Sequence, residues 1–374
     1  MIYLDSAATT MQKPASVSEA MRRAVRQMAS PGRGSHRPAM LAADTVFSCR
    51  EVAARMFGAA QPDHVVFTSN ATHALNIAIK STVKPGSTVL ISGYEHNAVT
   101  RPLAAIPGVT VRVAEGPLFC PDQLLEQIQK AMQKKVDAMV CTHVSNVFGY
   151  VLPISEIAEI CREKHVPLIV DASQSAGCLP VSLRDWGAAF VAMPGHKGLY
   201  GPQGTGLLIC SNEAVRPIME GGTGSASALQ TMPEYLPDRL EAGTHNIPGI
   251  AGLLEGLRFV EAKGIAKILE HERRLALRAV RGLERIPGVE VFSVPGLLNQ
   301  TGVLSFRLPG MDCEIAAERL GQADIAVRAG LHCAPLAHRS AGTLEHGTVR
   351  MSLSAFNTLY DVECFVEKVS RISA

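Results

Sequence analysis

The residue whose type and surroundings best suit covalent chemistry is Lys197. It lies between a predicted strand and a glycine-rich turn, in the sequence MPGHKGLYGPQGTG at residues 193–206. A primary amine in this position can form a Schiff base with an aldehyde cofactor, and glycines let the backbone approach a flat ring closely. The alternative is a surface lysine beside a tight turn. Lys197 is therefore our candidate for the attachment of an aldehyde cofactor.

A second chemical group, the carboxylate of Asp171, ends the apolar run VPLIVD at residues 166–171. An acid at the carboxyl end of a parallel strand points into the crevice where open α/β sheets bind ligands. Such a carboxylate can keep a pyridinium nitrogen protonated, which makes the ring an electron sink. The structural alternative is that Asp171 caps the next helix. The presence of Lys197 favours the cofactor over the cap.

The turn after the predicted strand 64–68 carries polar side chains at the start of a predicted helix, among them Ser69, Asn70 and Thr72. Free backbone N–H groups and the positive end of a helix dipole attract anions, and a phosphate is the natural occupant. The dipole contributes only about 0.3–1 kcal/mol at exposed sites, so the hydroxyls and His196 must also contribute. Plain capping by Ser69 or Asn70 is the alternative for this turn.

A histidine occupies a further strand-to-helix turn, in the sequence YEHN at residues 94–97. There the imidazole of His96 can lie flat against an aromatic cofactor, or it can simply be hydrogen-bonded structure. The glycine-rich strings at 201–206 and 222–227 lack the G-x-G-x-x-G spacing that opens a helix near the start of a chain. A nicotinamide-dependent dehydrogenase is therefore disfavoured.

The elements that must position these groups form a repeating pattern of short β-branched runs and longer amphipathic stretches. This pattern is typical of βαβ units and predicts a mainly parallel sheet covered on both faces. Strands are predicted at residues 64–68, 88–92, 109–113, 137–142, 168–171, 189–193 and 205–210. Apolar residues at helical spacing predict helices between them, at 71–80, 122–134 and 154–165.

The pattern changes after a loop-like stretch that ends near residue 249. Two long helical segments, 250–263 and 266–285, lead into short β-rich runs with a helix between them. We therefore expect an α/β fold with a large domain at 16–249, built on a seven-stranded sheet. A small α+β domain is expected from residues 250–374 together with the N-terminal segment 1–15.

Composition excludes several classes of protein. Of the 374 residues, 47% are hydrophobic and 19% are charged, and the net charge of +2 shows no basic surface for nucleic acid. No apolar run approaches the roughly 20 residues that span a bilayer, so no membrane association is expected. Nine cysteines without a C-x-x-C pair predict reduced thiols in the cytoplasm and no metal.

Taken in order, these segments resemble the class V aminotransferase family of fold type I pyridoxal 5'-phosphate (PLP) enzymes, and specifically its cysteine desulfurase and selenocysteine lyase branch. The resemblance runs from YLDSAAT at residues 3–9 to VRMSLSAFNT at 349–358. It implies PLP linked to Lys197, with Asp171 at the ring nitrogen. It places Gln174 near the ring hydroxyl, His96 on the ring, Asn146 beside cofactor and substrate, and Ala71, Thr72 and His196 at the phosphate.

The resemblance also implies contacts beyond the cofactor. Thr244, in EAGTHN at residues 241–246, matches the stretch that reaches the phosphate of a neighbouring subunit, which implies a homodimer with shared active sites. Arg350 matches the arginine that grips the substrate carboxylate together with Asn146. A guanidinium suits this task because it pairs with a carboxylate through two parallel hydrogen bonds.

The branch is selected by AVRAGLHCAP at residues 326–335, which is similar to the R-x-G-x-H-C-A-x-P loop of desulfurases. We expect Cys333 to be a nucleophile on a mobile, partly exposed loop, since only its thiolate attacks sulfur. An ordinary thiol pKa of about 8.5 calls for a nearby cation, and His332 and Arg328 are both candidates. The alternative is an inert buried cysteine.

The implied function is a cysteine desulfurase that converts L-cysteine to L-alanine, leaves a persulfide on Cys333 and passes the sulfur to an acceptor protein. Lys197 is expected to remove the α-proton. Alternatives are a selenocysteine lyase acting on L-selenocysteine, a class V transaminase, and a PLP-binding scaffold without turnover. This sequence departs from the family's pattern at two positions. Pro194 stands where many relatives have serine, and Asn70 stands where relatives often have glycine or threonine. The insert at 337–347 has no assignment.

Overall fold

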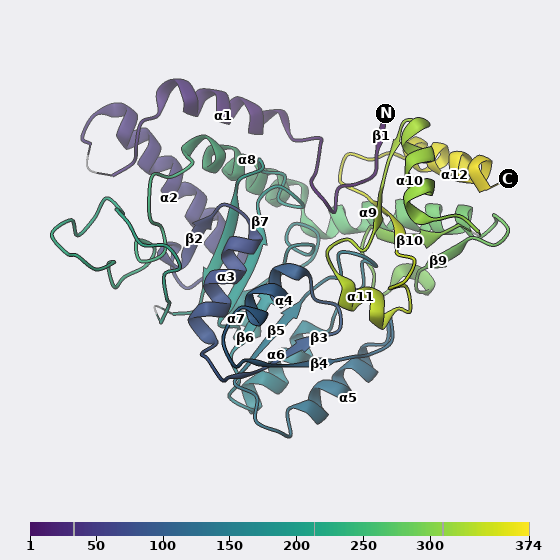
Figure 1. The fold of residues 1–374 in the computed structure, drawn as a ribbon. Coiled ribbons are helices and arrows are strands. Elements are labelled where there is room, and N and C mark those ends of the chain that lie inside the picture. The colour runs from purple at the N-terminus through teal and green to yellow at the C-terminus, as the bar shows by residue number, and fades with distance from the viewer. Residues whose placement is uncertain (33, 213, 309, 374) are drawn as a thin grey trace.

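The computed structural model describes residues 1–32, 34–212, 214–308 and 310–373 and is drawn in Figure 1. Its largest sheet has seven strands in the order β2-β8-β7-β6-β5-β3-β4, and only β8 runs against the others. The strands are β2 (Val65–Thr68), β3 (Thr88–Ser92), β4 (Thr110–Ala114), β5 (Ala138–Thr142), β6 (Leu168–Asp171), β7 (Phe190–Pro194) and β8 (Gly206–Cys210). The predicted mainly parallel, seven-stranded sheet is confirmed, with each strand placed to within about one residue.

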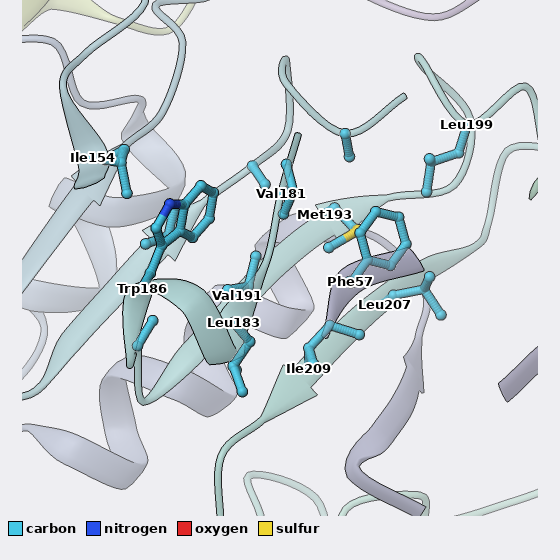
Figure 2. Packing of buried hydrophobic residues seen from close by; sticks show 14 of the residues in the cluster. Phe57, Ile154, Val181, Leu183, Trp186, Val191, Met193, Leu199, Leu207 and Ile209 are labelled. Atoms are coloured by element: carbon cyan, nitrogen blue, oxygen red, sulfur yellow. The ribbon is translucent and has the colours of Figure 1, made fainter. Parts of the chain in front are cut away.

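The sheet is buried on both faces because its strands are apolar at nearly every position. Along β5, Met139 and Cys141 pack into one hydrophobic cluster, whereas Ala138 and Val140 pack into the cluster on the opposite face. Figure 2 shows part of the first cluster, where β7 and β8 contribute Val191, Met193, Leu207 and Ile209 beside Phe57 and Trp186. Two buried faces require helices on both sides of the sheet.

Those helices come from the first two thirds of the chain. They are α1 (Ala15–Gln27), α2 (Arg37–Phe57), α3 (Ala71–Thr82), α4 (Asn97–Ala104), α5 (Pro121–Ala131), α6 (Ile154–Glu163), α7 (Leu183–Trp186) and α8 (Ile247–Lys263), with a short 3-10 turn at Pro62–His64. Helix α8 packs against α1 and α2 and places Leu253 and Leu257 in the first cluster. The domain boundary that we expect near residue 249 stays a prediction.

A second, smaller sheet is antiparallel, in the order β12-β13-β10-β9. Its strands are β9 (Glu290–Phe292), β10 (Val303–Arg307), β12 (Arg328–Gly330) and β13 (Thr348–Ser352), and the nearby helices are α9 (Ile265–Leu283), α10 (Cys313–Gln322), α11 (Pro335–Ser340) and α12 (Leu359–Ser373), with a 3-10 turn at Pro295–Leu297. The N-terminal strand β1 (Ile2–Tyr3) pairs with β11 (Ile325–Ala326), and Leu4 enters the core of this part. Figure 1 shows β1 beside α10 and α12, away from the large sheet.

Within the described residues, none of the helices combines the length and the apolar character that a bilayer span requires.

Candidate active site

A cavity opens at the carboxyl ends of the parallel strands β5, β6 and β7. Thr142, Asp171 and Pro194, the last residues of these strands, all line it. This is the edge at which open α/β sheets bind ligands, because the loops that follow the strands diverge there. The predicted residues that line the cavity are Ala71, Thr72, His96, Asn146, Asp171, Gln174, His196 and Lys197.

Lys197 and Asp171 give the cavity its electrostatic character. Asp171 is 3% exposed, and its Oδ1 accepts a hydrogen bond from the N–H of Ser173 at 2.9 Å. Burial lowers the pKa of Lys197 to about 8, although the carboxylate of Asp171 acts in the opposite direction. A sizeable fraction of this amine is therefore neutral near physiological pH, as a nucleophile or a base must be.

The loop that carries Lys197 is held by the N-terminal segment. The carbonyl oxygen of His196 accepts hydrogen bonds from Thr10 Oγ1 and from Lys13 Nζ, both at 3.0 Å. The ring Nδ1 of His196 lies 3.0 Å from Thr9 Oγ1. Burial lowers the pKa of Lys13 to about 8 and that of His196 to about 4, so the histidine is neutral. The sequence motifs did not predict these contacts of Thr9, Thr10 and Lys13 with His196, which we call the N-terminal clamp.

His96 immediately precedes α4, and its ring takes part in the cap of that helix. Nδ1 accepts the N–H of Ala98 at 3.0 Å, so in the neutral ring the proton resides on Nε2. Burial lowers the pKa of His96, which favours this neutral form. The structural interpretation of His96 is confirmed, and the same residue lines the cavity. That its ring lies against a cofactor stays a prediction.

The predicted phosphate site combines a helix cap with free donors. Asn70 Oδ1 accepts the N–H of His73 at 2.9 Å, so the capping alternative holds for Asn70. Ala71 and Thr72, the first residues of α3, line the cavity. The N–H groups of a first helical turn have no acceptor within the helix, and they remain available to an anion.

A buried acid that sequence reasoning did not single out lies beneath this cavity. Glu95 Oε1 accepts hydrogen bonds from Ser92 Oγ at 2.5 Å and from the N–H of Thr142 at 2.8 Å. Burial raises the pKa of Glu95 to about 8, and the nearby charge of Asp171 acts in the same direction. At neutral pH Glu95 is therefore mainly protonated.

Arg350 lies behind Asn146 and is 1% exposed. Its Nη1 donates to the backbone oxygen of Asn146 at 2.9 Å, and its Nη2 pairs with Asp5 Oδ1 at 2.7 Å. Its Nε has no partner among the described residues. Asp5 supplies the opposite charge that a buried guanidinium requires, a role that sequence reasoning did not assign. That Arg350 grips a substrate carboxylate stays a prediction.

Cys333 differs from every other cysteine that the structure describes, because it alone is exposed. The others are buried or partly buried, and burial raises the pKa of Cys49 to about 12. The carbonyl oxygen of Cys333 accepts the N–H of Asn97 at 2.8 Å, which places this residue next to the His96 turn. Cys333 is therefore not a buried cysteine, and its role as the nucleophile stays a prediction.

One candidate for the cation near Cys333 is corrected by the structure. His332 is 5% exposed, and burial lowers its pKa to about 2, so its ring is neutral. The reason is tertiary packing that the sequence alone did not reveal. Arg328 is exposed and always charged, and it remains the candidate.

Thr244 does not line the first cavity. It lines a second one together with Glu241 and His245. A buried ion pair anchors this segment, because Arg50 Nη1 and Nη2 donate to Glu241 Oε1 and Oε2 at 2.8 and 2.5 Å. The segment is firmly attached to its own chain. That Thr244 serves a neighbouring subunit stays a prediction.

The chemistry of the donor set fits PLP. An amine with a lowered pKa suits the aldehyde, a buried carboxylate suits the ring nitrogen, and the N–H groups at the start of α3 suit the phosphate. Gln174 is also prepared for a ligand, because its Nε2 donates to Ala7 O at 3.0 Å and its amide oxygen stays free to accept. Among the described residues, no group of three or more His, Cys, Asp or Glu side chains is placed to hold a metal ion.

The architecture is similar to that of a solved structure, the apo form of a cysteine desulfurase from Thermococcus onnurineus. The TM-score is 0.91 and the sequence identity 31%, over 100% of this chain and 94% of that one. The fold is therefore fold type I of the PLP-dependent enzymes. The family model "Aminotransferase class-V" matches residues 2–365. The chain belongs to the class V aminotransferase family, as its motifs predict.

Relatives within the family point to one branch. A probable cysteine desulfurase of Methanothermobacter thermautotrophicus is 33% identical over 386 residues, which cover 100% of this chain and 94% of the relative. A cysteine desulfurase of Escherichia coli is also 33% identical, over 100% of this chain and 93% of the relative.

Proposed function

We propose that this chain is a PLP-dependent cysteine desulfurase that converts L-cysteine to L-alanine and retains the sulfur as a persulfide on Cys333. The observation that carries the proposal is the exposed Cys333, hydrogen-bonded through its backbone to Asn97 at the edge of the cavity that contains Lys197 and Asp171. The names of its relatives support the same reaction.

The cofactor would be held by the residues that line the first cavity. Lys197 would bind its aldehyde, Asp171 its ring nitrogen and Gln174 its hydroxyl, while His96 would lie against the ring. Ala71, Thr72 and His196 would bind the phosphate, with Thr244 contributed by a second subunit. When bound, PLP supplies an electron sink that stabilises negative charge on substrate carbon next to the amino group.

The protein's own groups then orient the substrate and move its proton. Arg350 and Asn146 would hold the carboxylate of L-cysteine. Lys197 Nζ would take the proton from the α-carbon and later return a proton to the carbon product. Its lowered pKa of about 8 suits this role, because the neutral amine is the form that accepts a proton.

The sulfur itself passes directly from the substrate to Cys333, while Lys197 and the bound cofactor serve the carbon part of the substrate. The Cys333 thiolate attacks the substrate sulfur, a sulfur–sulfur bond forms, and the bond between that sulfur and the substrate β-carbon breaks. The electron pair of the broken bond stays with the carbon, which takes up a proton and leaves as L-alanine. The thiol is oxidised to a persulfide while carbon is reduced, so no external oxidant is needed.

Two other activities remain in the same family. A transaminase has no use for an exposed thiol at the edge of the cavity, so the placement of Cys333 disfavours it. A selenocysteine lyase shares the same residues, and the relative turnover of L-cysteine and L-selenocysteine separates the two.

The proposed assembly is a homodimer. Helix α2 exposes Met40 and Phe47, which are 56% and 51% exposed and lie on one face of the helix at a spacing of seven residues. We propose that a second chain covers these two side chains in the dimer. Light scattering of the purified protein tests for a mass of two chains.

We also propose that the enzyme works in the cytoplasm and passes its sulfur to an acceptor protein. The nine free thiols fit a reducing compartment. An exposed persulfide fits transfer to a thiolate of another protein.

The decisive variant is Cys333→Ala. We expect it to bind the cofactor with an unchanged absorbance spectrum and to lose sulfide release from L-cysteine. Sulfide release at the wild-type rate would refute the role of Cys333, and the matched variant Cys364→Ala, a partly buried thiol on α12, controls for general loss of thiols.

A further inference from the structure

The segment that follows Cys333 includes the insert at 337–347, which has no counterpart in the motifs described above. In the structure this segment forms α11 and a turn that lie against the large sheet rather than in solvent. Ala337 belongs to the core cluster of the large sheet, and Ser340 Oγ donates to the backbone oxygen of Gly93 at 2.9 Å. Figure 1 shows α11 close to the strands of both sheets. The loop that carries Cys333 is therefore anchored on its C-terminal side.

Three buried side chains form a hydrogen-bonded row behind this loop. Thr343 Oγ1 lies 2.7 Å from His338 Nδ1, and His338 Nε2 lies 3.4 Å from His332 Nδ1. The row ends where His332 Nε2 lies 3.3 Å from the backbone oxygen of Arg328. The three residues are 1%, 0% and 5% exposed, and the two rings are almost parallel, 10° apart.

Only one arrangement of protons satisfies every contact in the row with neutral rings. The carbonyl of Arg328 can only accept, so His332 Nε2 carries a proton and donates it. His332 Nδ1 then accepts from His338 Nε2–H, and His338 Nδ1 accepts from the hydroxyl of Thr343. The ring nitrogen, at 2.7 Å, is closer to this hydroxyl than its other acceptor, the carbonyl oxygen of His338 at 3.3 Å. Burial lowers the pKa of His338 to about 4 and that of His332 to about 2, which agrees with two neutral rings.

The row ends at a strained piece of backbone. His332 and Cys333 have φ angles of +50° and +56°, in the left-handed region that residues other than glycine rarely adopt. Such a conformation persists only when its surroundings hold it. Asn146 Nδ2 donates to the carbonyl of His332 at 2.8 Å, and the N–H of Asn97 donates to the carbonyl of Cys333 at 2.8 Å. The row adds a third restraint to these two hydrogen bonds, because it fixes the side chain of His332.

We propose that Thr343 and His338 are positioning residues that act through His332 to hold the thiol of Cys333 where it reaches the substrate sulfur. This inference rests on the proposed function, since it assigns the two residues to the sulfur-transfer step of that reaction. Neither residue lines the cavity, so they act on the backbone of the nucleophile and not on cofactor or substrate.

The test separates two steps of one turnover. Holoenzyme is mixed rapidly with L-cysteine. The change in cofactor absorbance reports that substrate has engaged the cavity, and the amount of persulfide on Cys333, trapped by alkylation and measured by mass spectrometry, reports the attack. The matched pair is Thr343→Val, which keeps the shape and removes the hydroxyl, and Thr343→Ser, which keeps the hydroxyl. Thr82→Val is the remote control, since it likewise removes a threonine hydroxyl that makes a hydrogen bond, in this case to the carbonyl oxygen of Ala78 at 2.9 Å.

We expect Thr343→Val to keep the absorbance change and to form persulfide about tenfold or more slowly, because a small displacement of a reacting group costs this much. Thr343→Ser and Thr82→Val should both resemble the wild type. A second pair of variants, at His338, gives an independent test in case Thr343→Val does not fold. His338→Gln keeps a side-chain N–H able to reach His332, and it should form persulfide faster than His338→Leu, which offers no donor.

Persulfide formation by Thr343→Val at the wild-type rate would overturn the inference, as would equal rates for the two His338 variants. An equal loss of both signals in Thr343→Val would also overturn it, because the row would then support the whole cavity. A wild type that forms no persulfide at all, whatever the variants do, would instead refute the proposed function.

Discussion

The buried charge of Lys197 should lower the stability of the cofactor-free protein, compared with a variant that has an uncharged side chain at this position. At pH 7 the lysine is mainly protonated in the folded chain and almost fully protonated in the unfolded chain, and the folded chain bears the cost of keeping this charge away from water. The difference between the ordinary pKa of 10.5 and the lowered value of about 8, at about 1.4 kcal/mol for each pH unit, corresponds to about 3.5 kcal/mol. Replacing Lys197 by methionine, which has a similar length and no charge, should therefore stabilise the apoprotein by up to this amount.

The pH dependence of this gain has a definite sign. Between about pH 8 and 10.5 the folded chain has released the proton of Lys197 while the unfolded chain still binds it, so the wild type gains stability relative to Lys197→Met as the pH rises. At pH 9.5 the gain from the substitution should fall to about 1.4 kcal/mol. Below about pH 8 the full difference should remain.

The measurement is urea unfolding of the apoproteins at pH 7 and at pH 9.5. Lys130→Met, which removes an exposed lysine from α5, is the control and should change stability little at either pH. If Lys197→Met is no more stable than the wild type at pH 7, or if its advantage does not shrink at pH 9.5, the amine is not buried as described and the argument for its lowered pKa fails.

Two further predictions concern buried arginines. Glu241→Gln leaves Arg50 buried without its counter-charge, so the free energy of unfolding should fall by about 3–5 kcal/mol in denaturant titrations; unchanged stability would mean that Arg50 finds water or another acid. Arg350→Lys keeps a charge but loses the planar contacts to Asp5 and Asn146. We expect its KM for L-cysteine to rise by about tenfold with the cofactor spectrum unchanged, and an unchanged KM would contradict the substrate role of Arg350.

The large sheet could be predicted from the sequence because its signals are local. Each strand is a short apolar run bounded by turn residues, as in β5, which is buried along its whole length. The polar residues directly after these runs, such as Asp171, had to lie at one edge of the sheet, since the carboxyl ends of parallel strands meet there. The residues that line the first cavity were accessible to sequence reasoning for this reason.

The N-terminal clamp could not be found in the same way. Thr9, Thr10 and Lys13 contact His196 across more than 180 residues of chain, and Asp5 meets Arg350 across an even longer separation. Nothing local in the sequence links these partners. The incorrect expectation for His332 has a related cause, because its burial depends on how the insert at 337–347 folds back over it.

The proposed reaction depends most directly on Cys333, whose Sγ receives the sulfur of the substrate. The sharpest measurement is one turnover of the holoenzyme with L-cysteine labelled with heavy sulfur, followed by alkylation, digestion and mass spectrometry of every cysteine-containing peptide. We predict one labelled sulfur on the peptide that contains Cys333 and an equal amount of L-alanine. Label on a different cysteine, or L-alanine released with no sulfur retained by the protein, would contradict the account.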